Sequence, residues 1–586
     1  MSSQPVLPED VLLAVLATMD RPDAARMMRA SRFLYSEGPK VILSGTITIC
    51  SDKDLSRFLS FINTDRARRS KFVRSLRVDI PERDGSEHFQ RLGVALEGCS
   101  YLSSLSVAVH SFDQIFSFFA LLDADVRDNG SGRGLHNLID SLVLQIHLRS
   151  HFSDSEPQRC RMALSRALPR MTNLRMLSIT FDADLVMSDP DCSSALFAMR
   201  SIQTLRLCGS LDNAFSTLKN LRSQLVSVTL NSWSFVAGHD WAVNYVADVR
   251  TLHPVELLSH SQSTLTELRT YQWTTHSDIP PDTRFIYPKM RRLDLEKTGL
   301  PITMVYINAY PNLSHLRYST PEVKRASDEE FMREKYPFPM FMSADWRDLS
   351  IQRYDERHRF NVTAQNASGR TWAHLEKLCG HLLDLYMLGL TCTVDQVTLH
   401  LVASDKFSYM VDPVLTYLCP RSLKLLEGWP GNISGSAAQA FDVFCGKGGS
   451  RLEYLELRTC LLWGHKDVDF SEVMEGITSS LSQTRLQELK AEIYIGKHSL
   501  RDSDTVRITH VDYHRSGPYL PPPHDPYYPL SPAEHSAECL DLEEWLCSFG
   551  QAVSMLRKAE IVVVGPWRRW RRAVLASGEV HYEDKA

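Results

Sequence analysis

A short pattern of apolar and polar positions recurs along most of the chain. It reads apolar-x-x-Leu-x-apolar, as in Val73–Val78, Leu102–Val107 and Leu174–Ile179. Further full or partial copies lie at 139–144, 202–207, 265–268, 290–295, 313–316, 382–387, 452–457 and 486–489. Adjacent copies start roughly 23 to 37 residues apart, a spacing that overlaps and exceeds the period of about 20–29 residues usual for one class of stacked repeats. Because alternate positions of a strand face opposite sides, each copy predicts one short strand with its leucines in a shared core.

The segments between copies predict helices that return the chain to the next parallel strand. Residues 160–168 and 195–200 fit such helices, and proline or asparagine precedes several strands, as at Pro169, Asn173 and Pro311-Asn312. The sequence therefore predicts an α/β fold, an irregular solenoid over residues 46–586 with a curved parallel sheet and outer helices. An unrelated α/β fold is the alternative, because Leu-x-x-Leu also occurs in ordinary helices.

Two stretches show no clear copy of the pattern, and both are expected to project from the solenoid as inserts. They are residues of about 320–370 and 497–535, the second of which is rich in proline. After them, residues 540–549 predict an amphipathic helix and 559–564 a closing strand.

The first 45 residues follow a helical period instead. Leu7-Pro8-Glu9-Asp10 suits the first turn of a helix, with acidic side chains at its positive end. Apolar residues follow at the 3–4 spacing of one helical face, and residues 20–23 break the pattern, with Asp23 as a candidate cap for the next helix. The pattern predicts a small three-helix domain over residues 5–45.

This N-terminal unit resembles an F-box. The resemblance rests on Leu7-Pro8-Glu9-Asp10-Val11-Leu12-Leu13, on Val15-Leu16, and on the ending Ser31-Arg32-Phe33-Leu34-Tyr35. Phe33 or Tyr35 stands where the family usually has tryptophan, and Met19 replaces leucine at the end of the first helix. The F-box followed by degenerate leucine-rich repeats is similar to the large F-box families of fungi.

The resemblance implies a substrate-recognition adaptor of a Skp–cullin–F-box-type ubiquitin ligase. The F-box would bind the Skp-type adaptor, and through it a cullin-RING ligase, while the repeats would hold a protein substrate. The residues implied in adaptor binding are Leu7, Pro8, Glu9, Val11, Leu12, Val15, Leu16 and Phe33. Two alternatives stay open: these residues only hold three small helices together, or the helices only cap a leucine-rich-repeat interaction scaffold.

Residues that alternate with the inward leucines are expected on the concave side, where a substrate would bind. The candidate substrate-binding residues are Arg206, Arg269, Arg292, Arg317, Tyr386 and Tyr454. The four arginines suit an acidic or phosphorylated segment, because guanidinium groups pair bidentately with phosphate. Ordinary solvated face residues are the alternative interpretation.

Composition narrows the class of protein further. The 586 residues are 43% hydrophobic and 23% charged with a net charge of −5, so no global charge favours nucleic acid or an anionic membrane. The twelve cysteines include no Cys-x-x-Cys pair. Neither a secretory signal nor an 18-residue apolar run is found. We therefore expect a cytoplasmic or nuclear protein with reduced thiols.

The basic run 567–572 is interpreted as a solvated terminal helix rather than a nucleic-acid site. Because no catalytic, cofactor or metal motif occurs, we expect a protein that is not an enzyme.

Overall fold

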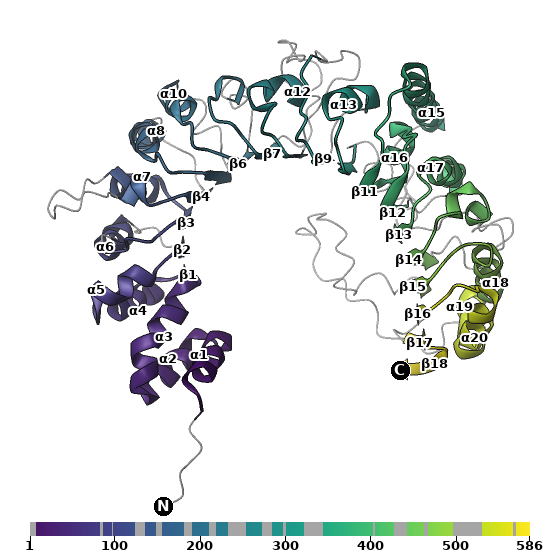
Figure 1. The fold of residues 1–586 in the computed structure, drawn as a ribbon, viewed down its shortest axis with the longest axis horizontal. Helices are drawn as coiled ribbons and strands as arrows, with labels where there is room; N and C mark the ends of the chain where they lie inside the picture. Colours follow the sequence, from purple (N-terminus) through teal and green to yellow (C-terminus); the bar gives the residue numbers. More distant parts are fainter. Residues whose placement is uncertain are drawn as a thin grey trace, which may run out of the picture. The chain divides into compact units, whose positions relative to one another are not determined.

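The computed structural model divides into two compact units, Met1–Tyr271 and Gln272–Ala586, which we call unit 1 and unit 2. Both are mixed α/β and solenoid-like, built on mostly parallel strands (Figure 1). The structure describes residues 7–81, 86–96, 98–123, 135–147, 155–180, 190–209, 218–232, 253–271, 284–296, 300–320, 344–401, 405–426, 442–461, 467–495, 530–565 and 570–585.

The sheet of unit 1 contains eight described strands, each hydrogen-bonded in parallel to the next in sequence. They are β1 (Thr46–Ile49), β2 (Ser75–Asp79), β3 (Ser104–Val109), β4 (Ser141–Ile146), β5 (Met176–Thr180), β6 (Thr204–Gly209), β7 (Ser227–Ser232) and β8 (Glu267–Tyr271). The register places the pattern leucines side by side, so that Leu76, Leu105 and Leu142 follow one another across the sheet. All three are almost fully buried. The repeated leucine thus forms a continuous apolar row, as predicted.

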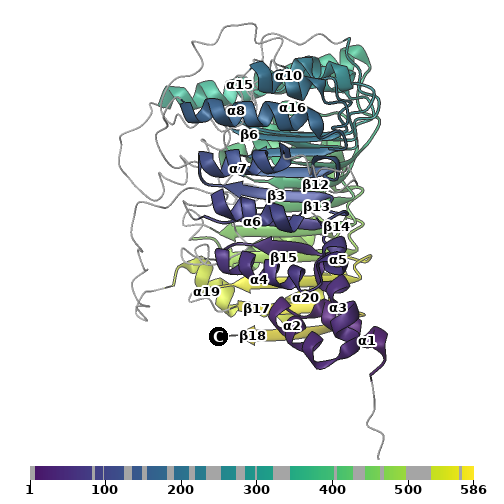
Figure 2. The same cartoon turned by 90° about the vertical axis from the view of Figure 1, so that its left-hand side faces the viewer.

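The helices of unit 1 cover one face of this sheet, the face into which the leucines point. In Figure 2, α4, α6, α7 and α8 stand in front of the strands as one layer. The helices are α1 (Glu9–Thr18), α2 (Arg21–Ala30), α3 (Arg32–Ser44), α4 (Asp52–Asn63), α5 (Arg66–Arg69), α6 (Ser86–Leu96), α7 (Phe112–Asp123), α8 (Ser155–Ala167), α10 (Pro190–Ala198) and α12 (Pro254–Leu257). Short 3-10 turns lie at Ser70–Phe72, Leu135–Asn137, Leu168–Arg170 and Ser259–Ser261. The predicted return helices correspond to α8 and α10.

Unit 2 continues the same plan and ends differently. Its described strands are β9 (Arg292–Glu296), β10 (His315–Tyr318), β11 (Leu375–His381), β12 (Val394–His400), β13 (Ser422–Leu426), β14 (Tyr454–Leu461), β15 (Glu488–Ile495), β16 (Lys558–Val564), β17 (Trp570–Ala576) and β18 (Glu579–Lys585). Neighbours are parallel from β9 to β16. The last two strands are antiparallel and form a hairpin, whose turn uses Gly578 at a positive φ of 85°.

The helices of unit 2 also lie on one face of its strands (Figure 1). They are α13 (Thr303–Ala309), α15 (Ala344–Ser368), α16 (Leu382–Leu388), α17 (Val411–Leu418), α18 (Phe470–Leu481), α19 (Pro532–Cys539) and α20 (Leu542–Ala552), with 3-10 turns at Asp405–Met410 and Lys447–Gly449. In each unit we call the other sheet face, away from the helices, the open face.

Asparagine side chains tie successive strands together where the sequence predicted turn chemistry. The Asn173 side chain donates a hydrogen bond to the Asn137 carbonyl at 2.6 Å. Asn312 donates in the same way to the Pro288 carbonyl at 2.9 Å. Each bond satisfies a backbone group of the preceding turn, so the asparagine before a strand fixes the stacking of neighbouring repeats.

Several predictions about unit 2 are wrong. Residues 382–387 form helix α16, and the neighbouring strand is β11. The second half of the first expected insert is helix α15, whose buried Asn361 donates to the carbonyls of Pro301 and Met387 at 3.0 and 2.7 Å. The end of the second expected insert belongs to α19; residues 321–343 and 496–529 lie outside the described residues.

Two further corrections concern the C-terminal end. Residues 570–572, expected in a helix, begin strand β17, and 566–569 lie outside the described residues. The strand predicted at 559–564 is present as β16, but β17 and β18 follow it, so it does not close the sheet. Among the described residues, no helix is long and apolar enough to cross a bilayer.

Candidate partner-binding surfaces

The N-terminal helices pack around a small apolar core. Leu16 of α1, Ala24 and Met28 of α2 and Leu34 of α3 are buried together. The side chain of Asp20, rather than that of Asp23, caps α2 by accepting from the Asp23 amide at 2.9 Å, which corrects the predicted cap. Three helices are therefore present where the sequence predicted them.

One side of α1 carries apolar residues that this core does not cover. Leu7 is 57% exposed, Val11 and Val15 are each 38% exposed, and Met19 at the C-cap is 40% exposed. Val11 and Val15 are four apart and lie along one side of α1, with Met19 four residues further on at the C-cap, and Leu7 directly precedes the N-cap Pro8. We call Leu7, Val11, Val15 and Met19 the α1 stripe. An apolar row of this kind on an exposed helix is typical of a contact surface.

The predicted adaptor-binding residues thus divide into two groups. Leu16 is 2% exposed and holds the helical core, while Leu12 and Phe33 pack partly buried against it. Leu7, Pro8, Glu9, Val11 and Val15 are exposed on or beside α1. This second group is the more accessible one, and Met19 joins it, although the sequence analysis treated Met19 as a departure from the family pattern.

Buried and paired arginines attach α3 to the first repeat. Arg69 is 4% exposed, and its guanidinium lies 4.3 Å from the ring centre of Phe61 and 5.2 Å from that of Tyr35. It also donates to the Phe61 carbonyl at 2.8 Å. Arg68 pairs with Glu37 of α3 at 2.8 Å. These contacts hold the three helices against α4 and α5, so that the α1 stripe has a fixed position within unit 1.

The open faces hold five of the six predicted substrate-binding residues, but most of their charges are already paired. Arg269 contacts Glu267 at 2.6 Å, Arg292 contacts Asp294 at 2.9 Å, and Arg317 contacts Glu296 at 3.2 Å. Arg206 is exposed on β6. Because three of the four arginines have carboxylate partners, the arginines do not form an unneutralised phosphate-binding strip. The interpretation as face residues fits this geometry better.

Tyr386 lies on helix α16 and not on a strand, so its predicted place on the open face is wrong. Its hydroxyl donates to Asp355 of α15 at 2.9 Å, and its ring stacks on His358 with the ring centres 4.1 Å apart. The Tyr409 hydroxyl donates to the same carboxylate at 3.2 Å. Burial and the Asp355 carboxylate raise the pKa of Tyr386 above its ordinary value. Tyr386 therefore joins two helices instead of facing a substrate.

The open face of unit 2 carries a chain of ion pairs beside the predicted residue Tyr454. Lys424 of β13 contacts Glu456 of β14 at 2.6 Å, and Arg458 contacts Glu456 at 3.2 Å and Glu492 of β15 at 3.4 Å. The Tyr454 hydroxyl also donates to Glu456, at 3.1 Å. We call Lys424, Glu456, Arg458 and Glu492 the charge ladder.

Glu456 is the centre of this ladder. It is 6% exposed although it lies on the open face. Burial raises the pKa of Glu456, but the hydrogen bond and charge of Lys424, together with those of Tyr454 and Arg458, outweigh burial and leave the pKa below its ordinary value. Burial, with the charge of Glu456, raises the pKa of Tyr454 to about 12. The ladder therefore holds an ionised carboxylate under a layer of neighbouring side chains.

The sequence contains only a weak signal for the ladder. Leu423-Lys424-Leu425 is a shortened copy of the pattern, with Pro420 where the first apolar residue would stand. Unless this strand is identified, the sequence shows no partner for Glu456 in the preceding repeat. A search for Leu-x-Leu alone would have found it.

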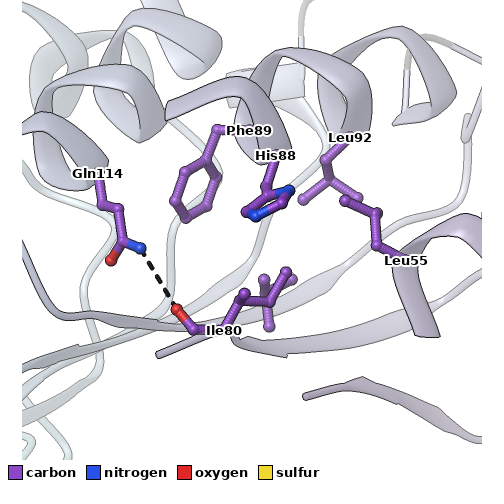
Figure 3. A pocket seen from close by; sticks show the side chains of 7 residues that line it. Leu55, Ile80, His88, Phe89, Leu92 and Gln114 are labelled. Atoms are coloured by element: carbon purple, nitrogen blue, oxygen red, sulfur yellow. Dashed lines mark hydrogen bonds between the residues drawn. The ribbon is translucent and has the colours of Figure 1, made fainter. Parts of the chain in front are cut away.

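A small cavity lies inside unit 1, between α4, α6 and β2. Figure 3 shows His88, Phe89 and Leu92 of α6 pointing toward Ile80 and Leu55. At its edge, the Gln114 side chain donates to the Ile80 carbonyl at 3.3 Å. Its volume is about 10 Å³, which is room for at most one water molecule. The cavity is therefore a packing gap and not a ligand site.

Within the described parts of both units, no group of three or more histidine, cysteine, aspartate or glutamate side chains could hold a metal ion. The two surfaces are an apolar helix side in unit 1 and a paired, charged sheet face in unit 2. No protein-family model matches the chain, and no curated protein matches it either.

Proposed function

We propose that the chain is a substrate-recognition adaptor of a Skp–cullin–F-box-type ubiquitin ligase. In this proposal α1–α3 form the F-box and bind a Skp-type adaptor, and the leucine-rich repeats bind a protein substrate. The observation that carries the proposal is the α1 stripe, because apolar side chains left exposed along one side of α1 favour a partner surface. It lies in the segment whose sequence resembles an F-box.

The attachment of α3 to the first repeat suits this role. An adaptor of this class acts by proximity: it makes and breaks no bond, and it must hold two partners at a fixed separation. Arg69 and Arg68 fix the helices on α4 and α5. A Skp-type adaptor bound to the α1 stripe would therefore keep one orientation relative to the sheet of unit 1.

The alternative is a leucine-rich-repeat scaffold in which α1–α3 only cap the solenoid. A cap covers the last apolar core and turns a polar side to the solvent. The α1 stripe departs from that expectation, since Leu7, Val11, Val15 and Met19 are all more than one-third exposed. This favours the adaptor over a cap alone.

The test is binding of the full chain to a purified Skp-type adaptor. Val15→Asp should reduce binding at least tenfold, because a carboxylate placed in an apolar contact is desolvated without a partner. Val94→Asp is the matched control, since Val94 is an exposed valine on a different helix, α6; it should bind like the unaltered chain. If the unaltered chain shows no binding, or if both variants lose binding equally, the adaptor proposal is wrong and the scaffold remains.

A further inference from the structure

Among the described strands, β18 has a hydrogen-bonded neighbour on one side only and so forms an edge of the sheet of unit 2. It pairs with β17 along one side only, from Ala576 opposite Glu579 to Trp570 opposite Lys585. No other described strand pairs with it. Of residues 579–584, all but Val580 are exposed. An exposed edge of this length presents a row of backbone groups suited to pairing with another strand.

The sequence of β18, Glu-Val-His-Tyr-Glu-Asp-Lys, is complementary to itself in the antiparallel direction. When two copies are aligned about Tyr582, Glu579 stands opposite Lys585 and His581 stands opposite Glu583, and each of these pairs occurs twice. Tyr582 stands opposite the second Tyr582, and Val580 opposite Asp584. Opposite charges and aromatic pairs across strands are the arrangements that stabilise an antiparallel pair.

Shifted alignments are worse. An alignment about His581 places Glu579 opposite Glu583 twice, and one about Glu583 places His581 opposite Lys585 and Glu583 opposite itself. Like charges directly opposite each other destabilise a strand pair. The charges therefore favour the one alignment that also uses all seven residues of β18.

On the side that faces the helix layer, the hairpin of β17 and β18 would offer a second copy of the chain an apolar contact. Val580 and Tyr582 stand opposite Leu575 and Ala573 of β17, which are buried under the helix layer. Gly550 of α20 lies close to Leu575: an added Cβ would come within 3.0 Å of that side chain. Tyr582 is 41% exposed at the rim of this layer. A second β18 would bring another Tyr582 beside it and extend the layer.

We propose that β18 is a self-association edge, through which two copies of this chain form an antiparallel dimer centred on Tyr582. The pairing is isologous and uses the edge of both copies, so it stops at the dimer. The interface is small, and the association is of the weak, concentration-dependent class. The dimer is independent of the proposed adaptor role of α1–α3.

The experiment is sedimentation velocity of the full chain over a concentration series. The unaltered chain should pass from monomer to dimer. Glu579→Lys places lysine opposite lysine, and Lys585→Glu places glutamate opposite glutamate, so each variant alone should dimerise about tenfold more weakly. An equimolar mixture of the two variants restores both opposite-charge pairs and should dimerise like the unaltered chain. The double variant Glu579→Lys/Lys585→Glu should do the same.

Circular dichroism and thermal unfolding of each variant check that the hairpin still folds, since Glu579 is exposed. Recovery of dimer in the mixture supports the antiparallel alignment, because no effect of the single substitutions on folding would be repaired by mixing. A chain that stays monomeric at every concentration overturns the proposal. Single variants that dimerise as well as the unaltered chain, or a mixture that fails to recover, overturn it too.

Discussion

The open faces of the two units differ at equivalent positions of the repeat. At the position just before the second leucine, unit 1 carries mainly small hydroxyl residues: Thr46, Ser75, Ser104, Ser141, Thr204 and Ser227, with Met176 and Glu267. The same position in unit 2 carries Arg292, His315, Lys377, Gln396, Ser422, Tyr454, Glu488 and Lys558. The strand pairing is the same in both sets.

The comparison separates the inward residues, which form the core under the sheet, from the outward residues, which cover its open face. The inward leucines are buried alike in the two units, for example Leu205 at 2% and Leu455 at 1% exposure. At this position most side chains of unit 1 are short and most of those of unit 2 are long. Two residues further along the strand, the outward Lys424 of unit 2 reaches Glu456 of the next strand. The inward positions therefore set the fold, and the outward positions are free to set the binding properties of each face.

The largest expected effect is one that the two units share. Leu205→Ala and Leu455→Ala each remove a nearly fully buried side chain from the leucine row. Each should lower the free energy of unfolding of its own unit by about 2–5 kcal/mol, through lost burial and the cavity left behind. Hydrogen exchange measured at increasing urea concentration, followed on peptides from β6 and β14, reports the two units separately. A large loss in one unit and almost none in the other would show that the two leucine rows are not equivalent.

The sequence predicts this shared part of the fold well. Copies such as 102–107 and 452–457 are strands, because a leucine flanked by polar residues satisfies both the core and the solvent side of a strand. The strand prediction fails for copy 382–387, because the spacing of Leu382 and Leu385 also fits one side of a helix. Gly389, in the left-handed region at φ 55°, ends that helix. The strand of that repeat, β11, precedes it.

Missed strands have a different cause. In β7 and β12 the second leucine is replaced by Val228 and Val397, which fill the same inward place with a β-branched side chain. A search for leucine alone passes over them. Predicting the charge ladder requires more than the positions of the strands, because its ion pairs depend on which strands are neighbours and on the register between them. The 3–4 spacing of apolar residues predicts the apolar face of α1. It does not tell which residues of that face are buried in the helical core and which are exposed.

The second prediction separates the two open faces. Lys424 and Arg206 occupy the same repeat position, between two inward leucines. Lys424→Ala removes the nearest cation from the buried Glu456 carboxylate and should lower the free energy of unfolding of unit 2 by about 1–2 kcal/mol. Arg206→Ala in unit 1 should change it by less than about 0.5 kcal/mol, as for an exposed side chain. Urea-dependent exchange at β13–β14 and at β6 measures both, and equal losses would contradict the proposed difference between the faces.

The smallest expected effect concerns pH and again applies to unit 2. The pKa of Glu456 is lowered in the folded chain, so its contribution to stability is present at neutral pH. That contribution is lost as the pH falls below the ordinary value of 4.5 and through the folded value. Glu456→Gln keeps the shape of the side chain, and we expect it to cost about 1 kcal/mol at pH 7. As the pH falls from 5 to 3, this cost should shrink, because the unaltered chain becomes protonated at the same site.

Exchange of β14 amides in both chains across that range gives the measurement. Glu267→Gln, which alters the Arg269 pair of unit 1, is the control and is expected to show little pH dependence. A cost that stays constant with pH would mean that the carboxylate of Glu456 is not held in its ionised form by Lys424 and Arg458.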